Sequence, residues 1–184
     1  GYEQPRVEKC PVCGSPYIGG FKAGTQQIEQ VLHKNFPKAR ILRMDYDTTR
    51  AKGSYEKILS SFAAHAADIL VGTQMIVKGH DFPDVTLVGA LAADLSLNAA
   101  DYRCAERTFQ LLTQAVGRSG RGTKPGEAII QSYHPDHYSI RTAAEQDYEA
   151  FYQEEMAYRM LMDYPPTAHM LSVLVSGENE ELLE

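Results

Sequence analysis

Residues 110–122 carry arginines next to glycines in a pattern that could bind phosphate. The stretch reads QLLTQAVGRSGRG, and its key positions are Gln114, Gly117, Arg118, Gly120 and Arg121, as Q-x-x-G-R-x-G-R. The forked guanidinium group of arginine binds phosphate through two parallel hydrogen bonds. Arginines at the end of a helix can instead stabilise the helix dipole, by roughly a few tenths of a kcal/mol each. Both interpretations stay open here, although capping alone does not account for Gln114 or the glycines.

Residues 71–82 form a second polar stretch, VGTQMIVKGHDF, directly after an apolar run. Its glycines permit tight turns and close approach of the backbone, and its other polar side chains offer hydrogen bonds and charge. The residues concerned are Gly72, Thr73, Gln74, Lys78, Gly79, His80 and Asp81. The stretch is consistent with a binding loop and equally with a plain polar connection between two strands.

Cys10 and Cys13 stand in the sequence CPVCG, which is typical of one half of a zinc ribbon. A structural zinc ion needs four ligands. The one other cysteine, Cys104, is expected to pack as a small apolar side chain on a helix, and His33 is more simply a surface residue. We predict the remnant of a zinc knuckle. A redox pair and a chance spacing remain as alternatives.

The elements that must position these residues follow from the polarity pattern. Apolar residues at helical spacing predict helices, and short apolar runs bounded by glycine or proline predict strands. The predicted order is helix 24–36, strand 40–44, helix 54–62, strand 68–71, strand 85–91, helix 101–116 and strand 127–131. This alternation predicts an α/β fold, a doubly wound parallel sheet with flanking helices. Both polar stretches then fall where such sheets bind ligands, near the carboxyl ends of strands.

Further expectations concern burial and the end of the chain. Strand 85–91 is apolar throughout, so we expect it to be buried on both faces. The stretch 136–162 predicts one long or broken helix, which the prolines after Tyr164 end. A strand at 170–175 and a helix from 178 would begin another domain. We therefore expect part of a longer protein, divided into a zinc-insertion remnant (1–20), a main lobe (21–163) and the start of a truncated C-terminal domain (164–184).

Composition limits the classes of function. The chain has 184 residues, of which 43% are hydrophobic, and a formal net charge of −6. A broad electrostatic footprint for nucleic acid needs clustered lysine and arginine, so any contact with a polyanion must be local. The sequence has no apolar run of about 18 residues and no secretion signal at the start. We predict a cytoplasmic protein with no membrane partner.

The two polar stretches resemble motifs V and VI of superfamily 2 helicases. Their order is that of the family, and so is their separation by a strand and a helix. More narrowly, segments such as CPVCGS, FPKARILRMDYDTT, ILVGTQMIVKGHDFPDVTLVG and QSYHPDH are similar to the C-terminal lobe of the replication-restart DNA helicases. The resemblance covers about residues 10–166. It implies a RecA-like lobe of an ATP-dependent 3′-to-5′ DNA helicase that acts at stalled replication forks and assembles the primosome.

The resemblance also implies roles for individual residues. Arg118 and Arg121 would contact the γ-phosphate of ATP, with Arg121 the arginine finger, and Gln114 would contact the phosphates or relay closure of the lobes. The implied positions at the nucleotide are Gly79, Asp81 and Gly117. Those along the DNA backbone are Thr73, Gln74 and Lys78. Cys10 and Cys13 would be the last knuckle of a zinc insertion.

The implied cofactors are ATP with Mg²⁺ and, in the full-length protein, zinc. The chain has no G-x-x-x-x-G-K-[ST] loop, so the nucleotide would be held mainly by another lobe, and this chain alone would be inactive as an ATPase. Implied partners are forked and single-stranded DNA, primosome proteins and single-stranded DNA-binding protein.

Two rival hypotheses remain from the sequence. One is a zinc-assisted module that binds DNA or docks a partner without a motor role, and the other is an independent α/β nucleotide-binding enzyme. Asp94 and Arg103 fall within the resembling stretch, but no chemistry can be assigned to them. A cap and a surface ion pair are the simpler expectations for these two residues.

Overall fold

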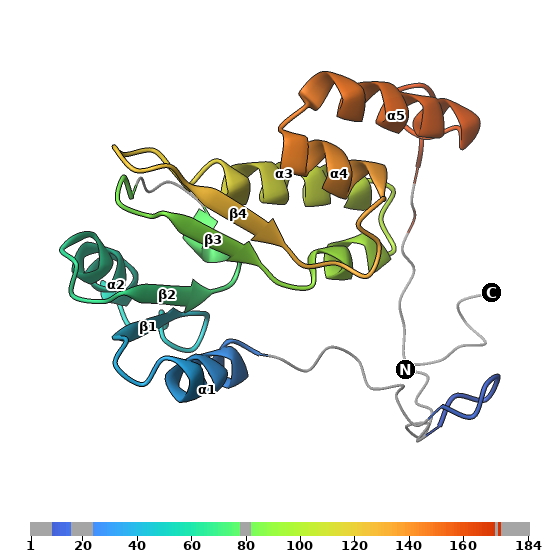
Figure 1. The fold of residues 1–184 in the computed structure, drawn as a ribbon. Helices are drawn as coiled ribbons and strands as arrows, with labels where there is room; N and C mark the ends of the chain where they lie inside the picture. Colours follow the sequence, from blue (N-terminus) through green and yellow to red (C-terminus); the bar gives the residue numbers. More distant parts are fainter. Residues whose placement is uncertain (1–8, 16–23, 78–81, 172, 174–184) are drawn as a thin grey trace. The chain divides into compact units, whose positions relative to one another are not determined.

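The structure of the chain is a computed structural model, which describes residues 9–15, 24–77, 82–171 and 173. The chain divides into two compact units, Gly1–Phe82 and Pro83–Glu184, and each is described by itself (Figure 1). None of the helices in the described ranges is long and apolar enough to span a membrane.

Unit 1 is a two-stranded parallel sheet with helices. Its elements are α1 (Thr25–Asn35), β1 (Ile41–Met44), α2 (Ser54–Ala63), β2 (Ile69–Gly72) and the 3-10 helix η1 (Gln74–Val77). The pairing of β1 with β2 runs from Ile41 opposite Ile69 to Met44 opposite Gly72. The buried core of the unit contains Met44, Leu59, Val71 and Phe82, and the ring of Phe82 meets that of Phe62 edge-on at 5.0 Å.

Unit 2 is a second two-stranded parallel sheet, with more helix. Its elements are β3 (Leu87–Ala90), η2 (Ala93–Asn98), α3 (Cys104–Val116), β4 (Glu127–Ile130), α4 (Tyr138–Glu145) and α5 (Tyr148–Leu161). In the pairing of β3 with β4, Leu87 lies opposite Glu127 and Ala90 opposite Ile130. One core cluster joins the helices and contains Ala93, Phe109, Leu112, Ile140, Ala143 and Phe151.

Helix α3 forms because its apolar residues fall on one face. Ala105, Phe109 and Leu112 are all at most 6% exposed, at the four- and three-residue spacing of a helical stripe. The helix begins at Cys104, slightly later than predicted. Asp101 explains the difference, since its carboxylate accepts the backbone N–H of Arg103 at 2.9 Å and holds a turn before the helix.

The predicted α/β content and parallel strands are confirmed. The described strands form two separate pairs, one in each unit, so a single doubly wound sheet stays a prediction. The expectation that strand 85–91 is buried on both faces is wrong, because Leu87 is 58% exposed. Side chains alternate along a strand, and the helical core of unit 2 packs on the face that carries Ala90 and Ile130.

The predicted long helix is present in its broken form. Gln146 takes a left-handed conformation after α4, and Asp147 begins α5 by accepting the backbone N–H of Ala150 at 2.9 Å. Of the predicted strand 170–175, the described positions 170, 171 and 173 are not in a strand. The rest of that strand and the helix predicted from 178 lie outside the described residues. The proposed domain boundaries stay predictions.

Candidate functional site

The arginine motif forms a tight loop at the C-terminal end of α3. Helix α3 ends at Val116, with Gly117 as its C-cap. The next turn is closed by hydrogen bonds from Arg118 N to the carbonyl of Ala115 (3.0 Å) and from Ser119 Oγ to that of Val116 (3.1 Å). We call residues 117–121 the arginine loop. The predicted helix end is therefore confirmed.

Gly120 ties the arginine loop to the segment just before β3. Its backbone N–H donates to the carbonyl of Val85 at 3.0 Å, and its φ of +71° is in the left-handed region that favours glycine. A Cβ at this position would lie 2.6 Å from the backbone nitrogen of Gly126. The backbone geometry alone therefore requires glycine here, whatever the loop binds.

Arg121 makes the capping contact considered from the sequence. Its Nε donates to the carbonyl oxygen of Gly117 at 2.6 Å, at the end of α3, while the residue as a whole is exposed. Arg118 is half-buried, and Gln114 is exposed on the last turns of α3. The structure thus brings Gln114, Gly117 and both arginines to one end of one helix. Their roles toward a phosphate stay predictions.

The described part of the second polar stretch lies at the carboxyl end of β2. Gly72 is the last residue of this strand, and a Cβ there would meet the backbone carbonyl of Met44 on β1. Thr73 and Gln74 follow and are exposed, with Gln74 beginning η1. They are placed at a strand end, as predicted. Lys78, Gly79, His80 and Asp81 lie outside the described residues.

Cys10 and Cys13 lie in a knuckle-like turn. Gly14 N donates to the carbonyl of Cys10 at 2.8 Å, and Cys10 N donates to that of Ser15 at 2.9 Å. The backbone N–H groups of Cys13 and Val12 lower the pKa of the Cys10 thiol, which favours the thiolate that zinc requires. The two residues fit half of a tetrahedral zinc site. The described residues contain no group of three or more metal-binding side chains.

We predict that this chain by itself holds zinc poorly. Two thiolates supply half of the four ligands, so most of the binding energy of a closed site is missing. Elemental analysis of the purified chain should give well under one zinc per molecule. A stoichiometric zinc that resists a chelator would contradict this and would indicate ligands from elsewhere in the chain or from a second copy.

Asp94 is a buried residue to which the sequence assigned no chemistry. It is 6% exposed and accepts hydrogen bonds from the hydroxyl of Ser132 and from Tyr133 N, the latter at 2.7 Å. Burial opposes its ionisation, but these hydrogen bonds outweigh burial and hold the pKa of Asp94 below its usual value. Asp94 is therefore not the helix cap considered from the sequence: it lies within η2, and its carboxylate binds the loop after β4. No local sequence pattern could have revealed these partners, because they follow the neighbouring strand β4.

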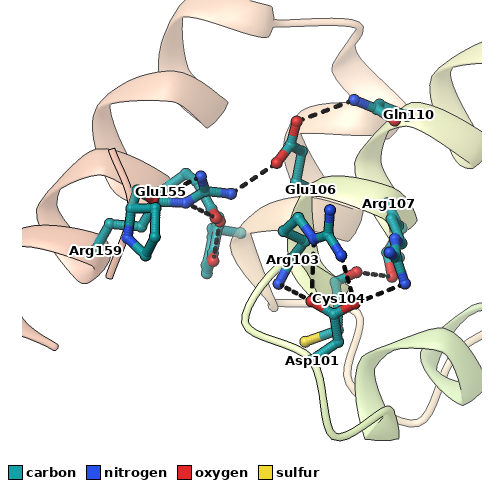
Figure 2. Close-up of polar contacts among 11 residues, drawn as sticks. Asp101, Arg103, Cys104, Glu106, Arg107, Gln110, Glu155 and Arg159 are labelled. Carbon is teal, nitrogen blue, oxygen red and sulfur yellow. Dashed lines mark hydrogen bonds and ion pairs between the residues drawn. The ribbon is translucent and has the colours of Figure 1, made fainter. Parts of the chain in front are cut away.

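Arg103 makes the surface ion pair expected of it. Its Nε lies 3.2 Å from the carboxylate of Asp101, which also binds Arg107 at 2.8 Å. Figure 2 shows these three side chains together before and along the first turn of α3. The side chains of both arginines are about half exposed, so the cluster contributes little net stability.

The family of the chain is shown by comparison with known proteins. The model of the family described as "Helicase conserved C-terminal domain" matches residues 20–123, more than half of the chain. The chain therefore belongs to the helicase C-terminal domain family. Its α/β content and parallel strands fit a RecA-like lobe.

Within this family, the chain is similar to proteins named Replication restart protein PriA. It is 55% identical to that of Bacillus subtilis, covering 97% of this chain and 22% of the relative. The relative from Synechocystis is 46% identical over 98% of the chain and 22% of its own length. The relative from Thermotoga maritima is 39% identical over 99% of the chain and 24% of its own length. The chain thus spans about a quarter of the length of these relatives.

Proposed function

We propose that this chain is the second motor lobe of an ATP-dependent 3′-to-5′ DNA helicase that restarts replication at stalled forks. The observation that carries the proposal is the arginine loop, which places Arg118 and Arg121 after the last turns of α3, near Gln114, in a member of a helicase family. The chain matches proteins named for replication restart, and these matches cover almost its entire length. That name supports the cellular process.

In this proposal, Arg118 and Arg121 stabilise the γ-phosphoryl group of ATP during transfer. Phosphoryl transfer depends on positioning and on neutralising charge, and arginines delivered by a second lobe complete such a site on closure. Arg121 would exchange its hydrogen bond to the Gly117 carbonyl for bonds to phosphate. This exchange is favourable, because a phosphate is negatively charged and accepts two parallel hydrogen bonds from a guanidinium group, whereas the carbonyl is neutral and accepts one.

The remaining assignments belong to the same proposal. Gln114 contacts the phosphates or relays closure, and Gly117 lies with Gly79 and Asp81 at the nucleotide. The DNA backbone is contacted by Thr73, Gln74 and Lys78. ATP with Mg²⁺ is held mainly by another lobe, which carries the phosphate loop that this sequence lacks. In the full-length protein, Cys10 and Cys13 hold zinc together with two further ligands.

The proposed partners follow from the same process. They are forked and single-stranded DNA, primosome proteins and single-stranded DNA-binding protein, and the proposed compartment is the cytoplasm. The proposal is tested in the full-length protein by replacing Arg121 and measuring ATP turnover, nucleotide affinity and melting temperature on one preparation.

A docking or DNA-binding module without a motor role is the second candidate. The observation that favours it is the knuckle-like turn at Cys10 and Cys13. The net charge of −6 counts against it as an unaided DNA binder.

DNA affinity separates the two candidates. A motor lobe with one side of the DNA groove should bind a labelled single-stranded oligonucleotide weakly and with a steep dependence on salt. Fluorescence anisotropy at about 150 mM salt, near physiological ionic strength, measures this. Binding that stays tight at this salt concentration would favour the module over the motor lobe.

A further inference from the structure

A buried arginine joins three parts of unit 2 beside α3. Arg159 of α5 is 9% exposed. Its Nε donates to Glu155 in α5 at 2.7 Å, its Nη2 to Glu106 in α3 at 2.7 Å, and its Nη1 to the carbonyl oxygen of Pro165 at 2.9 Å. Figure 2 shows Arg159 reaching Glu155 and, on the other side, Glu106. We call the group of Glu106, Glu155 and Arg159 the α3–α5 clamp.

The clamp extends to α4 and is largely shielded from water. Glu155 is 4% exposed and also accepts a hydrogen bond from the hydroxyl of Tyr138 at 2.6 Å. The ring of Tyr102 lies 5.4 Å from the Arg159 guanidinium carbon. The carbonyl of Arg159 in turn accepts the backbone N–H of Tyr164 at 2.9 Å. One residue thus fixes two helices and the turn that follows α5.

Stability alone does not account for this arrangement. A buried ion pair adds little net stability over apolar side chains of the same size, because the cost of desolvating the charges offsets their attraction. What distinguishes an arginine ion pair from an apolar contact is its fixed hydrogen-bond geometry. A planar guanidinium group offers donors at fixed angles, so the two acceptors on the α5 side orient the guanidinium and the third, Glu106, ties α3 to it.

The apolar contact between the two helices is a pivot that the clamp restrains. Phe109 of α3 and Phe151 of α5 stack with ring centroids 4.1 Å apart and planes 12° apart. Flat stacked rings resist separation more than they resist rotation. On one side of the pivot Glu106 binds Arg159 of α5, and on the other the carbonyl of Thr113 accepts Nε2 of Gln146, the residue after α4, at 3.3 Å.

The direction of α3 matters because the arginine loop follows it. Phe109, at the pivot, and Gly117 are separated by about 12 Å of helix, at about 1.5 Å per residue. A tilt of about 5° about the pivot therefore moves the arginine loop by about 1 Å. A misplacement of about 1 Å can lower the rate of a positioned reaction by about 10²-fold.

We propose that Arg159 is a positioning residue for the arginine loop, because it fixes the direction of α3 through Glu106. The inference rests on the proposed function, in which this loop acts on ATP. Arg159 itself touches no nucleotide. Its hydrogen bonds to Glu155 and to the Pro165 carbonyl hold the guanidinium in place, and its bond to Glu106 passes that position to α3.

Two substitutions in the full-length protein test the clamp. Arg159→Lys keeps the charge, but one ammonium cannot reproduce the planar fork. The DNA-stimulated kcat for ATP should fall by about 10²-fold, while KM for ATP changes by less than about threefold because the nucleotide is held mainly elsewhere. Glu106→Gln, at a partly exposed side chain, weakens the same contact without stranding a buried charge. Its kcat should fall by about tenfold.

A second measurement does not depend on catalysis. Hydrogen exchange of the amides in residues 114–121, measured without nucleotide, should accelerate several-fold in both variants. The kcat of the double variant should be little lower than that of Arg159→Lys alone, since the two residues act through one contact. The matched control is Arg141→Lys, because Arg141 pairs with Glu154 at 2.5 Å between α4 and α5 and is not part of the clamp. It should keep normal turnover and exchange.

The outcomes separate this inference from the proposed function. If Arg121→Ala abolishes turnover while Arg159→Lys and Glu106→Gln both leave it normal, the clamp does not position the loop. The same conclusion holds if exchange in residues 114–121 is unchanged in both variants. If Arg121→Ala leaves turnover normal, the proposed function fails instead, and hydrogen exchange still decides whether Arg159 orders the loop.

Discussion

Replacing Arg121 with alanine in the full-length protein (Arg121→Ala) is expected to lower the DNA-stimulated kcat for ATP by roughly 10³-fold or more, the scale of an arginine finger. Arg118→Ala should have an effect of the same order. Nucleotide affinity should fall much less, because the phosphate loop and Mg²⁺ of the other lobe carry most of the binding. Steady-state turnover, nucleotide titration and thermal unfolding of the same preparations measure all three quantities.

The capping contact of Arg121 makes this test sharp. If the bond to the Gly117 carbonyl were the whole role of the residue, its loss would lower the free energy of unfolding by less than about 1 kcal/mol and leave kcat nearly intact. Arg121→Lys should not restore turnover, since an ammonium lacks the bidentate fork. Arg141→Ala, which removes an exposed arginine from α4, is the matched control. An Arg121→Ala protein with normal kcat would remove the central claim.

The isolated chain of 184 residues is expected to hydrolyse no ATP, with or without DNA. Its arginines act on a phosphate that another lobe must hold, and the sequence contains no phosphate loop. The measurement is phosphate release over hours by chain that gives a cooperative melting transition, next to full-length protein as the positive control. Turnover by the folded chain that Arg121→Ala abolishes would show a complete active site within these residues.

The local elements could be predicted because their causes are local. The stripe of Ala105, Phe109 and Leu112 indicated α3, and Gly117 indicated where it ends. The break between α4 and α5 was predicted only as one of two options, since nothing nearby in the sequence shows that Gln146 takes a left-handed conformation.

Contacts between distant residues were beyond the reach of the sequence. Asp94 binds the loop after β4, and Arg159 binds Glu106 from another helix. Both are charged residues that a pattern places on the surface, yet the structure buries them, because hydrogen bonds compensate Asp94 and carboxylates pair with Arg159. Burial of strand 85–91 was overestimated for a related reason, since a sequence does not reveal which face the helices will cover.

The sequence indicated which residues belong to the candidate site. It did not indicate the backbone contacts that hold them in place. The glycines of the arginine motif suggested a phosphate, whereas Gly120 also has a purely structural reason to be glycine, its close approach to Gly126. A motif therefore combines residues that act with residues that hold the backbone. Only the structure distinguishes the second kind.

The arginine loop is held by main-chain hydrogen bonds, so its movements can be followed with a label on a nearby side chain. Gly120 N is bound to the Val85 carbonyl and Glu127 N to the Thr86 carbonyl, so both ends of the loop 121–126 are tied to the residues just before β3. Thr123, Lys124 and Pro125 between them are exposed. Exposed loop tips accept insertions readily. A fluorophore attached at position 124 would report the movements of the arginine loop while leaving both arginines, and the hydrogen bond from Gly120 to Val85, unaltered.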